Sequence, residues 1–165
     1  MKKIEAMVIA DSINPQGDRI TTFLLTYPRF IHSELMTHRM FSRNSASSRA
    51  IPFKKMVKMV EEDPFIPIAW QKHHSGMQGS EYFTSDVDIE ACRKQWLDAR
   101  NSAILHSSFM YYDGTTKQLC NRLLEPFMWH TVLVTATSYE NFFDLRCPKY
   151  TFGSATKNPR IWKSR

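Results

Sequence analysis

The first thirty residues of the chain contain two runs in which apolar and polar positions alternate, the pattern of a β-strand with one buried face. The alternating positions are Ile4, Ala6, Val8 and Ala10 in the first run and Ile20, Thr22, Leu24 and Thr26 in the second. Asn14, Pro15 and Gly17 lie between the runs, and these residue types favour turns. The pattern predicts an antiparallel hairpin.

The next apolar residues recur at intervals of three and four, which indicates helices. Ile31, Leu35 and Met36 predict a short helix, followed by a segment over 42–48 that we expect to be a loop because it is too polar to lie in the core. Pro52 suits the start of a second helix, which should end near Asp63. Its apolar positions are Phe53, Met56, Val57 and Val60.

The second half of the chain mixes helical and strand patterns. Residues 64–84 have no clear period and predict a long surface segment. A long helix should follow Ser85 and run to about Tyr112. We expect a further helix over 116–124 stopped by Pro126, a strand over 129–137 and a helix that opens at Asn141. Without repeats or a βαβ rhythm, the prediction is an α+β fold with a mixed, largely antiparallel sheet.

Composition changes this picture little. With 165 residues, 42% of them hydrophobic, the chain can bury one core, and we expect one domain over 1–147. The net charge is +6, of which +5 falls in residues 148–165, so we interpret that segment as a basic tail. Such a tail is weak support for a nucleic-acid partner, because no aromatic platform accompanies it. A solvated end is the preferred interpretation.

The cysteines and the hydropathy of the chain indicate its cellular compartment. Cys92, Cys120 and Cys147 are too widely spaced for a zinc site or a disulfide framework, so we expect reduced thiols. His73 and His74 have no carboxylate or cysteine at ligand spacing, and we predict no metal site there. No apolar run approaches the ~18 residues of a membrane span. We expect a cytoplasmic protein without a membrane partner.

Residues 37–49 carry the densest chemistry of the chain: one imidazole, three guanidinium groups and several hydroxyls. A phosphate monoester needs several donors with fixed charge, and arginine offers a planar fork that lysine lacks. Such donors are available from Arg39, Arg43 and Arg49, with Ser47 nearby. Arg43 is left out of the candidate site, because a single arginine is most often a surface charge.

The order of these residues resembles a known signature. His38 and Arg39, then Ser47 after seven residues and Arg49, are similar to the R-H-R-x7-S motif and downstream S-x-R of flavin-dependent thymidylate synthases. The segments 121–126 (NRLLEP) and 141–146 (NFFDLR) resemble two further elements of that family, in the same order. Over residues 3–147 the chain thus resembles a divergent, phage-like member of the family that is shortened at its C-terminal side.

The resemblance implies a fold like that of the thymidylate synthase-complementing proteins and a reaction. The enzyme would methylate dUMP to dTMP, with methylenetetrahydrofolate as carbon donor and reduced FAD as hydride donor. NADPH would reduce the flavin, and the protein would be a homotetramer. Two alternatives stay open: a catalytically impaired nucleotide-binding or interaction protein derived from that family, and a small basic protein that binds nucleic acid.

The same resemblance implies roles for individual residues. The expected FAD contacts are Thr37, His38, Arg39 and Asn141, and the expected dUMP contacts are Glu34, Ser45, Ser47, Arg49, Arg122 and Arg146. Of these, Arg146 and Ser47 would be catalytic. For Arg146 the reason is that a cation beside uracil N3 stabilises the negative charge that forms there. Departures from the family pattern occur at Thr37, Ser45, Ala50, Thr135 and Thr137.

Overall fold

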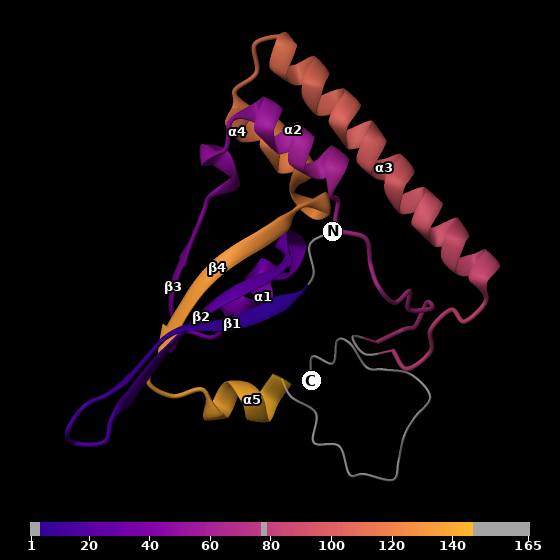
Figure 1. Cartoon of the computed structure of the whole chain (residues 1–165). Coiled ribbons are helices and arrows are strands. Elements are labelled where there is room, and N and C mark those ends of the chain that lie inside the picture. Colours follow the sequence, from indigo (N-terminus) through magenta and orange to yellow (C-terminus); the bar gives the residue numbers. More distant parts are fainter. Residues whose placement is uncertain (1–3, 77–78, 147–165) are drawn as a thin grey trace.

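The computed structural model describes residues 4–76 and 79–146, apart from the side chains of Leu145 and Arg146. Cys147 and the expected basic tail over 148–165 lie outside the described residues. The described part is an α+β fold with an antiparallel sheet at one end and a group of helices at the other, as Figure 1 shows. The predicted fold class is therefore confirmed.

The predicted hairpin is present as strands β1 (Glu5–Ile13) and β2 (Arg19–Pro28), which pair antiparallel. Its turn is closed by Asn14, whose amide N donates to the Asp18 carbonyl at 3.0 Å and whose Oδ1 accepts from the Asp18 amide at 2.8 Å. Gly17 has a φ of 94°, a region that residues with a Cβ rarely adopt. The turn chemistry thus sets the register of the hairpin.

The sheet contains two more strands, in the order β1-β2-β4-β3. Strand β4 (Trp129–Ala136) agrees with the strand expected over 129–137, whereas β3 (Ser42–Ser45) lies where a loop was expected. That expectation was wrong because β3 is an edge strand held by backbone pairing to β4, from Ser42 opposite Thr135 to Ser45 opposite Val132. Backbone pairing of this kind does not require apolar side chains.

The helices follow the periodic patterns closely. After a 3₁₀ turn, η1 (Arg29–Ile31), come α1 (His32–Met36), a second 3₁₀ turn η2 (Ser48–Ala50) and α2 (Phe53–Glu62). The long helix α3 spans Asp86–Tyr112, and α5 spans Glu140–Arg146. Among the described residues of 64–84, the only strand-like pairing is a single bridge between Gln71 and Tyr82.

The segment before β4 differs from expectation. Helix α4 covers only Lys117–Cys120, and a 3₁₀ segment, η3 (Asn121–Phe127), continues from it through Pro126. Proline lacks an N–H, but it does not end this segment because the chain has already tightened to 3₁₀ geometry at Asn121. As a result, Asn121 and Leu124 face inward and are both fully buried.

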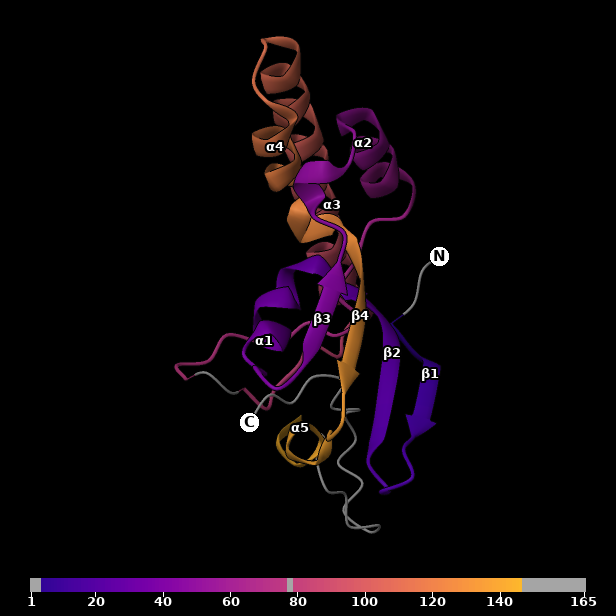
Figure 2. The ribbon, with the colours of Figure 1, turned by 90° about the vertical axis from the view of Figure 1, so that its left-hand side faces the viewer.

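Two apolar clusters hold the elements together. On one face of the sheet, residues of and next to α1 and α5 pack against Val132 and Val134 of β4. Between the helices, Met56 and Val60 of α2 meet Leu124 of η3, and α3 packs against that cluster. Segment η3 connects the helices with the sheet, since it packs against α2 and is followed by β4 (Figure 2). No described helix is long and apolar enough to cross a membrane.

Candidate functional site

The predicted site residues fall into two groups at opposite ends of strand β3. Thr37, His38 and Arg39 precede the strand, and Ser47 and Arg49 follow it. Because a strand rises about 3.3 Å per residue, the four residues of β3 alone separate the groups by about 10 Å. Figure 2 shows one end of β3 near α1 and α5 and the other end near α2 and α4.

The first group surrounds the half-buried ring of His38. Its centroid lies 5.7 Å from that of Phe41, nearly parallel, and 4.9 Å from that of Phe142 on α5, edge to face. The expected flavin contacts His38 and Asn141 are thus brought to the same end of the sheet, since Asn141 precedes Phe142 on α5 and is exposed. Arg39 is exposed beside them.

The turn that carries this group is fixed from two directions. The Thr37 hydroxyl donates to the carbonyl of Glu34 at 2.7 Å, and the Glu34 side chain is exposed. Arg43 Nη1 donates to the carbonyls of Leu35, Met36 and His38, at 3.1, 3.0 and 3.1 Å. Arg43 therefore binds the carbonyls of the last two residues of α1 and of His38 in the turn that follows. The expectation that Arg43 is a surface charge was wrong, because the residue is half-buried and binds three carbonyls of this turn.

The second group combines η2 with η3. Ser47 and Arg49 are exposed, and Arg122 on η3 has a side chain that is 54% exposed. Lys117 Nζ adds a positive charge nearby, where it donates to the Ala50 carbonyl at 3.3 Å. Two segments that are distant in sequence thus place two guanidinium groups and a hydroxyl at one end of the fold, a donor set suited to a phosphate.

Three of the remaining predicted positions lie on the sheet or next to it. Ser45 pairs with Val132 and is half-buried, between the two groups. The Thr135 hydroxyl lies 2.8 Å from that of Thr22 on β2, and Thr137 is exposed just after β4. Arg146 is the last residue of α5, and its side chain lies outside the described atoms. The described chain therefore does not unite all predicted residues in one place.

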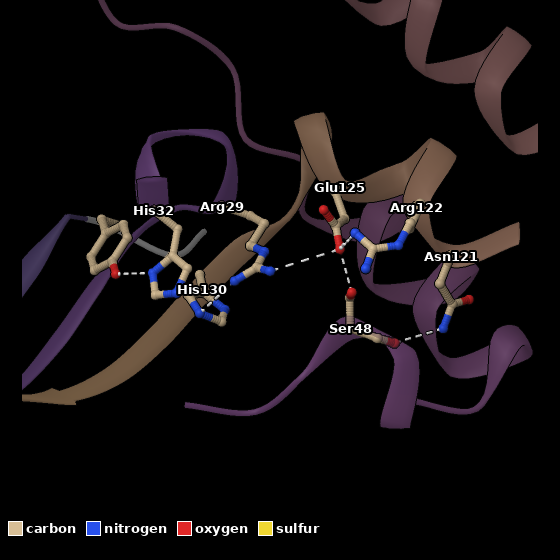
Figure 3. A network of polar contacts seen from close by, with 8 residues as sticks. Arg29, His32, Ser48, Asn121, Arg122, Glu125 and His130 are labelled. Carbon is tan, nitrogen blue, oxygen red and sulfur yellow. Dashed lines mark hydrogen bonds and ion pairs between the residues drawn. The ribbon is translucent and has the colours of Figure 1, made fainter. Parts of the chain in front are cut away.

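Behind the second group lies a polar network that the sequence did not reveal (Figure 3). The Ser48 hydroxyl, on a residue that is 1% exposed, donates to Oε1 of Glu125. Arg29 Nη2 lies 3.8 Å and Arg122 Nη1 4.0 Å from the same Oε1. Glu125 was visible only as a member of the NRLLEP segment, and Ser48 only as a neighbour of Ser47, so neither had a distinguishing signal.

The network continues through two histidines to β2. Arg29 Nη1 lies 3.0 Å from Nε2 of His130, and the rings of His130 and His32 meet edge to face at 4.6 Å. The Tyr27 hydroxyl lies 2.7 Å from Nδ1 of His32. Because arginine can only donate, His130 Nε2 must be the acceptor, which requires an unprotonated nitrogen.

The electrostatics of these groups agree with that assignment. Burial, and then the positive charges of Arg29 and His32, lower the pKa of His130 to about 4. Burial likewise lowers the pKa of His32 and raises the pKa of Tyr27 to about 12. Near neutral pH both imidazoles are therefore uncharged, and Tyr27 keeps its proton.

Comparison with known proteins identifies solved structures with a similar fold. No protein-family model matches the sequence, and no curated protein matches it. A crystal structure of the UMP/dUMP methylase PolB from Streptomyces cacaoi bound with 5-Br UMP is similar, with a TM-score of 0.68 and 17% identity. The match covers 94% of this chain and 81% of that one. PolB bound with 5-Br dUMP matches with a TM-score of 0.62 and 18% identity, over 84% of this chain and 57% of the other.

Proposed function

We propose that the protein methylates a uridine monophosphate, as a flavin-dependent thymidylate synthase converts dUMP to dTMP. The observation that carries the proposal is the exposed donor set of Ser47, Arg49 and Arg122, in a fold similar to that of a UMP/dUMP methylase. Fixed guanidinium charges and a hydroxyl suit a phosphate monoester, which both UMP and dUMP carry. We propose that these three side chains hold that phosphate.

For the remaining predicted residues, we propose roles from their positions in the sequence motifs. Glu34 and Ser45 are proposed to contact the nucleotide, and Arg146 is proposed to lie beside the uracil ring. A cation there would stabilise negative charge on the ring in the transition state, which lowers the barrier to transfer of the methylene group from methylenetetrahydrofolate. Ser47 is the second catalytic candidate, since its hydroxyl can donate to the bound nucleotide.

The residues around His38 fit a flavin. An imidazole packed between two aromatic rings, an exposed guanidinium group on Arg39 and an exposed amide on Asn141 provide a flat apolar contact and donors for a diphosphate. Thr37 can add a hydroxyl. Bound and reduced, FAD would supply the hydride that completes the methyl group, and NADPH is the proposed reductant.

The proposed flavin group and the proposed phosphate group lie at opposite ends of β3. We propose a homotetramer in which different protomers can supply the two groups to one site. The mass of the protein in solution, measured by light scattering, tests this part.

Equilibrium binding tests the proposal directly. Titration calorimetry with UMP, dUMP and uridine should show that both monophosphates bind and that uridine binds much more weakly. Arg49→Ala and Arg122→Ala should each weaken binding about 30-fold, because each removes a charge-assisted contact of about 2 kcal/mol. Arg93→Ala, which changes an exposed arginine on α3, is the matched control and should leave Kd unchanged.

The results also separate the alternatives. Equal affinity for uridine and UMP, or equal effects of Arg49→Ala and Arg93→Ala, would contradict the phosphate assignment. Nucleotide binding without methyl transfer would identify a binding protein in place of an enzyme. The flavin is tested separately, by the absorbance spectrum of the purified protein with added FAD and its change when dUMP is added.

A further inference from the structure

The carboxylate of Glu125 lies where three segments of the chain meet. Its Oε1 accepts the hydroxyl of Ser48 from η2 and lies 3.8 Å from Arg29 of η1. Arg122, on the same 3₁₀ segment as Glu125, approaches the same oxygen at 4.0 Å. The side chain of Glu125 is only 20% exposed, so these contacts replace much of its water.

Contacts of η2 with η3 go beyond this one carboxylate. The side-chain amide of Asn121 donates to the carbonyls of Ser48 and Ile51, both at 2.8 Å. Within η2, the amide of Ala50 donates to the Ser47 carbonyl at 3.0 Å and that of Ile51 to the Ser48 carbonyl at 3.2 Å. The backbone of this turn is thus attached to η3 at both of its ends, as Figure 3 shows in part.

The same arrangement fixes the residues of the proposed phosphate site. Ser47 and Arg49 flank Ser48 in the sequence, so the Ser48 contact with Glu125 sets the positions of their backbones. On the other side, Glu125 attracts the guanidinium group of Arg122. Arg29 in turn holds Glu125 and is itself held by His130, at 3.0 Å, and through its backbone amide by the Met128 carbonyl, at 2.9 Å.

We propose that Glu125 is a positioning residue for the nucleotide site. It orients Ser48 on one side and Arg122 on the other, so that Ser47, Arg49 and Arg122 can contact the same phosphate. This inference rests on the proposed function for its ligand. The contacts of Glu125 with Ser48 and Arg29 do not depend on that ligand.

The sign of the effect of a substitution distinguishes positioning from charge alone. A carboxylate 4.0 Å from Arg122 repels an approaching phosphate, so removing its charge would strengthen binding if charge alone mattered. Positioning gives the opposite result, because the amide of Glu125→Gln is a weaker acceptor for Ser48 and no longer holds the guanidinium groups. We expect UMP and dUMP to bind about tenfold more weakly to this variant.

Ser48→Ala provides a milder and independent variant, because it leaves the carboxylate with both arginines. It should also weaken binding, and the double variant should lose less than the product of the two single effects, since both act through one hydrogen bond. Glu61→Gln, an exposed glutamate on α2, is the matched control and should leave Kd unchanged. Unchanged or tighter binding by Glu125→Gln would overturn the proposal.

Hydrogen exchange gives a second measurement that needs no nucleotide. The amides of Ala50 and Ile51 should exchange faster in Glu125→Gln and Ser48→Ala than in the wild-type protein, while those in the middle of α3 keep their rates. If the wild-type protein binds neither UMP nor dUMP, the proposed function fails but this comparison still stands. Unchanged exchange at both amides would overturn the positioning role.

Discussion

Protonation of His130 should make the protein markedly less stable in mild acid. In the folded state its Nε2 accepts from Arg29 at 3.0 Å, its side chain is buried, and its pKa is about 4. In the unfolded chain a histidine has a pKa of about 6.5. The unfolded state therefore takes up more protons as the pH falls below 6.5, and stability falls with it.

The size of the effect follows from the two pKa values. Stability contributed by neutral His130 is fully present above pH 6.5 and is lost progressively as the pH falls toward 4. Between pH 8 and pH 5 the linkage amounts to at most about 2 kcal/mol, a large fraction of the stability of a typical domain. His32, whose pKa is also lowered, acts in the same direction.

Urea unfolding monitored by circular dichroism at pH 5, 6, 7 and 8 measures this loss, because urea adds no ions that screen the site. His130→Gln keeps a neutral acceptor close to the position of Nε2 but does not titrate. That variant should be less stable at pH 8 yet show a flatter dependence on pH. The matched control is His106→Gln, which changes an exposed histidine on α3 and should keep the wild-type dependence of stability on pH. If His130→Gln keeps the full wild-type slope, the reasoning is wrong.

Two further predictions address the core and the chemistry. Leu124→Ala should lower the free energy of unfolding by about 3 kcal/mol, because Leu124 is fully buried within the apolar cluster between the helices. Leu123→Ala, at a position 41% exposed, should cost much less in the same urea titration. Arg146→Ala should abolish tritium release from labelled dUMP while the circular dichroism spectrum stays that of the wild type, and unchanged release would exclude the assigned role.

The elements that the sequence predicted well are those whose side chains carry a period. Helix α2 buries Phe53, Met56 and Val60, and the hairpin alternates apolar and polar positions even though β1 is exposed along its length, so local spacing reports their structure. In helix α3 the one buried residue is Ser107, and that helix was predicted mainly from the capping Ser85 and the acidic residues of its first turn. Strand β3 was missed because its stability comes from backbone pairing with β4, about ninety residues further along the chain. Polar residues such as Ser42 and Asn44 on an exposed edge give no hydrophobic signal.

The candidate site was likewise predicted only in part from the sequence. Its exposed donors Ser47, Arg49 and Arg122 were found through a resemblance between short motifs, which needs no knowledge of the fold. The contacts that hold them were not, because Ser48 and Glu125 are 77 positions apart and Arg29 and His130 are 101 apart. Such pairings depend on how η1, η2 and η3 pack, so only the three-dimensional structure reveals them.

The two outer edges of the sheet are unequal, and this has a practical consequence. Strand β3 offers a neighbouring chain only four residues, whereas β1 offers nine, with Met7, Val8 and Ile9 all about half exposed. A long edge with apolar side chains on both faces is a template on which a strand of another molecule can add. We therefore expect this protein, at high concentration, to aggregate first through β1. Val8→Lys should reduce such aggregation, because it places a charge on that edge.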